Sequence, residues 1–231
     1  MSTNHIVKSY DQELAQLVRY AAQMGSLVEQ QLAAAIQAIH ARDNEIAGRT
    51  FASDTDIDTL ENELNELALR ILALRQPMAG DLRLIIGSMK IARDLERIGD
   101  YAASLAKRSR NLNAVEKISP TMTLVHMANQ VSPVLKQIVD AYTNNDVDKA
   151  TAAYEDDDII DESYHNLITE LMQYMQKHPE SIKECTHLLF MAKNLERIGD
   201  RATNIAETVH FIVKGSMPFI RKPKVLPDLH K

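Results

Sequence analysis

Leu95-Glu96-Arg97-Ile98-Gly99-Asp100 recurs unchanged as Leu195-Glu196-Arg197-Ile198-Gly199-Asp200. The likeness extends beyond this hexamer, because 9 of 16 positions are identical between residues 91–106 and 191–206. A hexamer repeated at corresponding places in the two halves of a chain indicates internal duplication. The sequence therefore predicts two halves of similar structure.

Apolar residues around both hexamers recur in alternating steps of three and four, the spacing of one buried face of an α-helix. Asp43 and Asp146 are placed to cap the second helix of each half, and Pro77 and Pro179 follow its end. We predict an all-α fold of six long helices in two tandem three-helix bundles related by internal duplication. The bundles would comprise residues 1–112 and 113–217, with an extended tail over 218–231.

Composition restricts the functional classes. The net charge is −6 and no stretch is rich in Lys and Arg, so a footprint for nucleic acid is missing. The single Cys185 cannot form an internal disulfide, which suits a reducing compartment. Residues 1–20 lack the apolar core of a secretory signal, and the longest apolar run, residues 188–192, is too short to cross a bilayer. We expect a cytoplasmic chain that neither binds nucleic acid nor inserts directly into a membrane.

Each hexamer carries two carboxylates four residues apart, a spacing that brings them to one face of a helix. The second helix of each half carries a similar pair. The candidate ligands are Glu96, Asp100, Glu196, Asp200, Asp54, Asp58, Asp157 and Asp161. If the second and third helices are neighbours, four carboxylates converge in each half, and such groups bind hard cations.

The helical angle of about 100° per residue places Glu96 and Asp100 roughly 140–180° from the middle of their apolar stripe. We therefore expect both pairs on the third helices to face out of the bundles, as surface sites. A solvated face is the competing interpretation, because Arg93 and Arg97 lie within reach of Glu96 and Asp100. The mid-helix glycines at 99 and 199 favour close helix–helix contact.

Other catalytic patterns are weak. Glu162-x-x-His165 and Glu184-x-x-His187 match the pattern of di-iron bundles, but both lie in the second half. No Gly-rich phosphate loop, nucleophile elbow or paired Cys motif is present. We interpret Cys185 as a core thiol and expect no enzymatic activity.

Tandem three-helix repeats that each carry Leu-Glu-Arg-Ile-Gly-Asp on the third helix resemble the PhoU family, the accessory proteins of phosphate-specific transport. Gly25–Leu32, Arg75-Gln76-Pro77 and Asp81-Leu82-Arg83 also match. The resemblance covers essentially the whole chain. It implies a cytoplasmic negative regulator of the phosphate-starvation response and of phosphate uptake.

The resemblance also implies partners and cofactors. The partners would be the ATPase subunit of a phosphate ABC transporter and a phosphate-sensing histidine kinase, with a homodimer as the expected assembly. The acidic motifs would hold divalent or iron-type metal ions (Fe, Zn, Mn or Mg). The repeats differ close to the hexamer: Asp94 corresponds to Asn194, and Tyr101 corresponds to Arg201. The two metal sites therefore need not have the same affinity or bind the same metal.

Two alternatives to a regulatory adaptor stay open at this point. One is a metalloenzyme of the helical-bundle class, and the other is a plain helical scaffold whose acidic faces are only solvated. The lack of a candidate nucleophile and of a positioned general base distinguishes the adaptor hypothesis from the enzyme hypothesis. Metal analysis would separate it from the scaffold.

Overall fold

The computed structural model describes residues 3–52 and 54–216, and side chains within those ranges except at residues 3–8, 51, 52 and 54. The first half contains α1 (Thr3–Ala41), α2 (Asn44–Ala52), α3 (Asp54–Arg75) and α4 (Ala79–Asn113). The second contains α5 (Pro120–Asn144), α6 (Val147–Glu155), α7 (Asp157–Lys177), a short 3₁₀ helix (Pro179–Ser181) and α8 (Ile182–Lys214). The described residues form no strand, which confirms the all-α prediction. The predicted tail over 218–231 lies outside the described residues.

The second helix of each half begins at its predicted cap. Asp43 Oδ1 accepts hydrogen bonds from the backbone N–H groups of Glu45 and Ile46, at 2.8 and 3.0 Å. Asp146 Oδ1 accepts one from Lys149 at 2.9 Å. Each cap satisfies donors that a helix start leaves without an internal partner.

In the second half the structure divides this second helix into a short and a long segment, α6 and α7, where the sequence predicted one helix. In the first half α2 and α3 lie on either side of residue 53, which is outside the described residues. In the second half α6 ends at Glu155, and the Asp156 N–H donates to the carbonyl of Ala152. Asp157 and Asp158 then stand in the first turn of α7. Carboxylates near the N-terminus of a helix are favourable, so this acidic run favours a new helix start over continuation.

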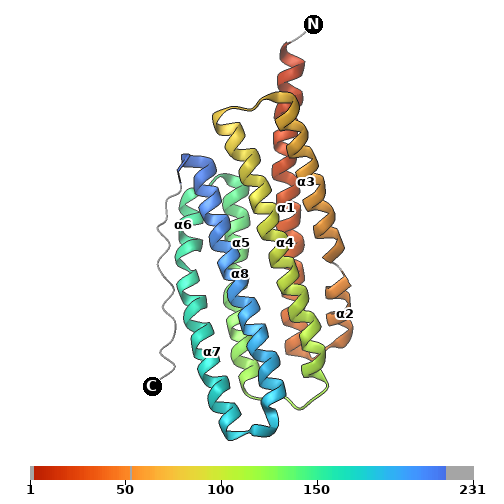
Figure 1. Ribbon diagram of the computed structural model, residues 1–231, viewed down its shortest axis with the longest axis vertical. Helices are drawn as coiled ribbons and strands as arrows, with labels where there is room; N and C mark the ends of the chain where they lie inside the picture. The colour runs from red at the N-terminus through yellow and green to blue at the C-terminus, as the bar shows by residue number, and fades with distance from the viewer. Residues whose placement is uncertain (1–2, 53, 217–231) are drawn as a thin grey trace.

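The helices pack into two bundles that lie side by side (Figure 1). α4 packs against α1, α2 and α3, and α8 against α5, α6 and α7. The bundles meet through α4 against α8 and α1 against α5. α4 and α8 run in opposite directions along the long axis (Figure 1). Both carry the repeated hexamer at their centres, so the duplicated sequence forms the middle of the molecule.

The core follows the predicted apolar stripes. Leu95, Ile98, Leu195 and Ile198 of the two hexamers are buried. Leu74, three residues after the buried Ile71, is instead 72% exposed, because it lies in the last turn of α3, before the chain reverses at Pro77. Among the described residues, no helix combines the length and apolar character needed to span a membrane.

Polar contacts also join the two halves. Arg201 Nη1 of α8 donates to Asp94 Oδ1 of α4 at 3.1 Å. Asn194 Nδ2 donates to Ser104 Oγ at 3.0 Å. Two of the positions at which the repeats differ, 94 with 194 and 101 with 201, therefore lie along the contact between α4 and α8. Burial raises the pKa of Asp94, and the hydrogen bond from Arg201 opposes that rise.

Candidate functional site: two carboxylate clusters

The second-half cluster lies between α7 and α8. Glu196 has a side chain only 6% exposed, and its Oε2 lies 2.6 Å from Lys193 Nζ. Asp157 is buried at the start of α7. A Cβ built at Gly199 would lie 2.5 Å from Asp157 Oδ1, so this carboxylate packs directly on the helical turn between Glu196 and Asp200. The glycine thus brings a carboxylate of one helix against the acidic motif of the next.

Asp161 belongs to the same cluster by helix register. Asp157 contacts Gly199, and Lys193 Nζ lies 5.4 Å from the ring of Tyr164, so α7 and α8 run antiparallel. Asp161 lies between these two levels of α7, opposite Glu196, and is partly buried. The structure therefore places Asp157 against the helical turn between Glu196 and Asp200, and helix register places Asp161 at the level of Glu196.

Replacing Gly199 with alanine is expected to destabilise the protein by about 1–3 kcal/mol. The added methyl group would lie 2.5 Å from Asp157 Oδ1 and 3.3 Å from Ile160 Cδ1, so α7 would have to move away from α8. Urea unfolding followed by circular dichroism measures the change.

Gly48→Ala is the matched control, because Gly48 lies inside α2 with no atom within 4 Å of a built Cβ. Alanine there is expected to be neutral or to stabilise by up to about 1 kcal/mol, through helix propensity alone. If both substitutions change the free energy of unfolding equally, close packing against α7 does not explain the glycine at position 199.

The first-half cluster lies between α3 and α4. Arg97 Nη1 lies 2.7 Å from Asp100 Oδ2, and Arg97 Nε lies 3.3 Å from Glu96 Oε2. Burial raises the pKa of Glu96, the carboxylates of Asp100 and Glu61 raise it further, and Arg97 opposes them. Arg93 instead pairs with Glu61, at 3.9 Å. Arg97 thus forms the ion pairs expected for a solvated face. One of its partners, Glu96, is nevertheless in a position where burial disfavours the charged form.

The predicted outward orientation of the two glutamates is wrong. Only 13% of the Glu96 side chain and 6% of the Glu196 side chain are exposed. The apolar stripe marks only one covered side of the third helix. α4 and α8, however, have neighbours on three sides, so a residue far from the stripe still faces α3 or α7. The clusters lie between packed helices rather than on open surface.

Sequence reasoning missed Glu61 as a member of the first cluster. It lies one helical turn after Asp58, with a side chain 15% exposed, and its carboxylate acts on Glu96. The corresponding position in the second half, 103 residues later, is Tyr164, which lies beside Lys193. The spacing from Asp58 was the available signal, but the absence of an acid at position 164 hid it from a search for duplicated residues.

The remaining predicted ligands are placed less favourably. Asp58 is exposed, and Asp200 and Asp100 are partly buried. Asp54 begins α3, but its side chain lies outside the described residues. Among described side chains, no three His, Cys, Asp or Glu groups converge in a geometry that would hold a metal ion. The donor chemistry of both clusters suits a hard cation, and metal binding stays a prediction.

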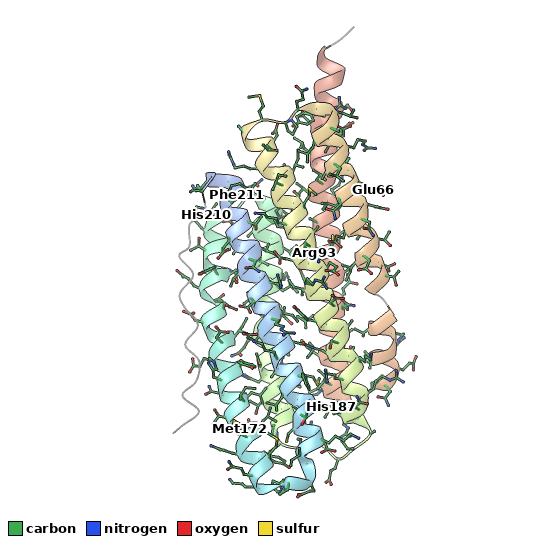
Figure 2. The ribbon with its side chains drawn as sticks, viewed as in Figure 1. Glu66, Arg93, Met172, His187, His210 and Phe211 are labelled. Atoms are coloured by element: carbon green, nitrogen blue, oxygen red, sulfur yellow. The ribbon has the colours of Figure 1, made fainter. Side chains whose placement is uncertain are left out.

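The other singled-out residues lie elsewhere. Cys185 is a buried free thiol, as predicted, and burial raises its pKa. His187 lies near the start of α8 (Figure 2), and burial with nearby Arg108 lowers its pKa. Neither belongs to a carboxylate cluster.

Two tandem copies of one three-helix unit, each with an acidic cluster between its second and third helices, define the class of protein. A family model described as "PhoU domain" matches the chain twice, over residues 21–109 and 124–209. The chain belongs to the PhoU family. This confirms the resemblance inferred from the repeated hexamer.

Curated relatives carry the same family name. A "Phosphate-specific transport system accessory protein PhoU homolog" of Caulobacter vibrioides is 44% identical, over 96% of this chain and 97% of its own length. The "Phosphate-specific transport system accessory protein PhoU" of Escherichia coli is 35% identical, over 91% of this chain and 88% of its own.

Solved structures match the fold. The crystal structure of PhoU from Pseudomonas aeruginosa has a TM-score of 0.87 and is 36% identical, covering 90% of this chain and 100% of that one. PhoU from Streptococcus pneumoniae has a TM-score of 0.85 at 28% identity. The likeness spans both halves and their arrangement.

Proposed function

We propose that this chain is a cytoplasmic negative regulator of phosphate-starvation signalling and phosphate uptake. It acts as an adaptor between the ATPase subunit of a phosphate ABC transporter and a phosphate-sensing histidine kinase. The observation that carries this proposal is likeness to phosphate-transport accessory proteins over 96% of the chain and both repeats. The chain is not an enzyme in this proposal.

The architecture supports an adaptor. Six long helices present extended faces, and protein partners commonly dock on such faces. Two bundles fixed side by side can hold two partners in a defined relative orientation. The experiment that tests this function is removal of the chain from its host, with alkaline phosphatase measured when phosphate is abundant.

The two carboxylate clusters form part of the proposal as cation sites. Asp157, Asp161, Glu196 and Asp200 would hold an ion in the second half. Glu96 and Asp100, with Glu61 and Asp58, would hold one in the first. A bound cation would offset the repulsion among these carboxylates, because a nearby positive charge favours their ionised form. It would also tie α3 to α4 and α7 to α8.

The double variant Glu96→Gln and Glu196→Gln is expected to weaken manganese or zinc binding at least about tenfold, since even outer-sphere changes typically cost 10–100-fold. Glutamine keeps the size of each side chain, so the buried position of Glu196 is not left as a cavity. Elemental mass spectrometry of dialysed protein and metal-induced shifts in melting temperature measure the loss.

Glu155→Gln with Glu162→Gln is the matched control, because both acids are exposed and lie outside the clusters. It removes the same charge and should leave bound metal unchanged. Equal metal content in the cluster variant and the wild type would exclude Glu96 and Glu196 as ligands.

A further inference from the structure

The line along which α4 and α8 lie side by side has a distinct composition, and two of its polar residues, Asp94 and Asn194, are buried. We name it the seam face and define it by twelve residues. α4 contributes Lys90, Asp94, Arg97, Tyr101, Ser104 and Arg108, and α8 contributes Phe190, Asn194, Arg197, Arg201, Asn204 and Phe211. Figure 1 shows these two helices adjacent along the length of the molecule, and Phe211 is labelled near one end of α8 in Figure 2.

The seam face is cationic on an acidic chain. It holds five cations, at positions 90, 97, 108, 197 and 201, against the single carboxylate of Asp94, whereas the whole chain has a net charge of −6. Arg201 is paired with Asp94 across the seam, and Arg97 is paired with Asp100. The other three cations of the seam face, Lys90, Arg108 and Arg197, take no part in these two ion pairs.

Each of these three cations lies on an aromatic ring instead of a carboxylate. Lys90 Nζ is 5.8 Å from the centre of the Phe211 ring. Arg108 and Arg197 lie 4.3 Å from the Phe190 ring and 5.7 Å from the Tyr101 ring. A ring face holds a cation in place without neutralising its charge.

None of the three forms an ion pair with a carboxylate among the described side chains. The Nε atom of Arg108 is buried and has no hydrogen-bond partner in the described part of the chain. Phe190 beside it is 51% exposed. Arginine and aromatic residues held together on a surface are the composition of protein-binding hot spots.

The acids of the two clusters lie beside the seam face rather than on it. Glu96 faces Glu61 of α3, and Glu196 lies on the side of α8 that packs against α7. The seam face is therefore a strip with an excess of cations, bordered by the two carboxylate clusters, where Arg93 pairs with Glu61 and Lys193 with Glu196. A narrow acidic ligand fits this pattern, whereas a broad polyanion would meet the acids on either side.

We propose that the seam face is a docking surface for an acidic α-helix of a partner protein. Lys90 and Arg108 lie about 27 Å apart along α4, which is five turns of a docked helix, and Arg197 of α8 lies beside Tyr101, between them. Such a helix is about 10–12 Å wide and can lie along the strip between the clusters. Carboxylates on one face of it pair with Lys90, Arg197 and Arg108. This inference rests on the proposed adaptor function and assigns one of its contacts to a surface.

A fluorescent 20-residue helical peptide with glutamates along one face is the probe. The wild-type protein should bind it at low ionic strength, and the affinity should fall at least about tenfold between 0.05 and 0.5 M salt. The variant Lys90→Glu, Arg108→Glu, Arg197→Glu should bind at least about thirtyfold more weakly. Fluorescence anisotropy measures both changes, and circular dichroism confirms folding.

The control variant Arg19→Glu, Arg49→Glu, Lys177→Glu makes the same change in net charge at exposed positions away from the seam face. It should weaken binding less than about threefold. Lys90→Gln, Arg108→Gln, Arg197→Gln replaces the reversal variant if that protein does not fold. The proposal is overturned if the control loses as much affinity as the seam variant. It is also overturned if a peptide with lysine for glutamate binds equally well, or if a single-stranded oligonucleotide binds the same cations more tightly.

The peptide experiment is independent of the cellular function. Absent or seam-independent peptide binding refutes the docking surface, even if cells lacking the chain lose repression. Seam-dependent peptide binding with normal repression in those cells refutes the adaptor function and leaves the docking surface in place. The two failures are therefore distinguishable.

Discussion

Replacing Arg201 with leucine is expected to lower the free energy of unfolding by about 2–3 kcal/mol. Arg201 donates to Asp94, whose side chain is only 12% exposed. Without the guanidinium, the buried carboxylate keeps its desolvation cost and loses its cation. Loss of one partner from a fully buried ion pair typically costs about 3–5 kcal/mol, and the 37% exposure of Arg201 reduces that figure. Urea unfolding measures the change.

The double variant Asp94→Asn with Arg201→Leu should recover much of the loss, because the buried charge is then removed together with its partner. Arg49→Leu provides a matched control. Arg49 pairs with Glu45 at 3.8 Å with both side chains more than 70% exposed, so its loss should change stability by less than about 0.5 kcal/mol. If Arg201→Leu and Arg49→Leu cost the same, the contact between the repeats contributes no specific stability.

The sequence predicts the fold well because its signals are local and repeated. The two hexamers identify α4 and α8 as equivalent helices, and the caps at Asp43 and Asp146 lie where the spacing of the repeats placed them. The break between α6 and α7 was missed. The apolar spacing runs through the break, and only the acidic run at Asp156 and Asp157 indicates a new start.

The candidate site was predicted in its residues but not in its surroundings. The carboxylate pairs are visible as spacings, whereas the burial of Glu196 depends on α7 covering a side of α8 that a single-helix projection leaves open. The contact between Asp94 and Arg201 was also beyond sequence reasoning. The sequence shows that the two repeats differ at both positions. The contact between the two side chains, however, follows from the antiparallel packing of α4 on α8.

Removing the chain from its host cell is expected to leave alkaline phosphatase expressed when phosphate is abundant. In this account the chain connects the transporter ATPase to the sensor kinase, so its loss frees the kinase from restraint. Expression should reach the level that wild-type cells show only during phosphate starvation. A copy of the wild-type gene should restore repression, and removing the sensor kinase as well should abolish expression, because the signal passes through it.

Alkaline phosphatase activity in high phosphate, compared between wild-type cells and cells lacking the chain, tests the regulatory function most directly. We expect high activity without the chain, low activity with it, and low activity when the sensor kinase is also absent. Normal repression in cells lacking the chain would contradict the account, as would high activity that persists without the kinase.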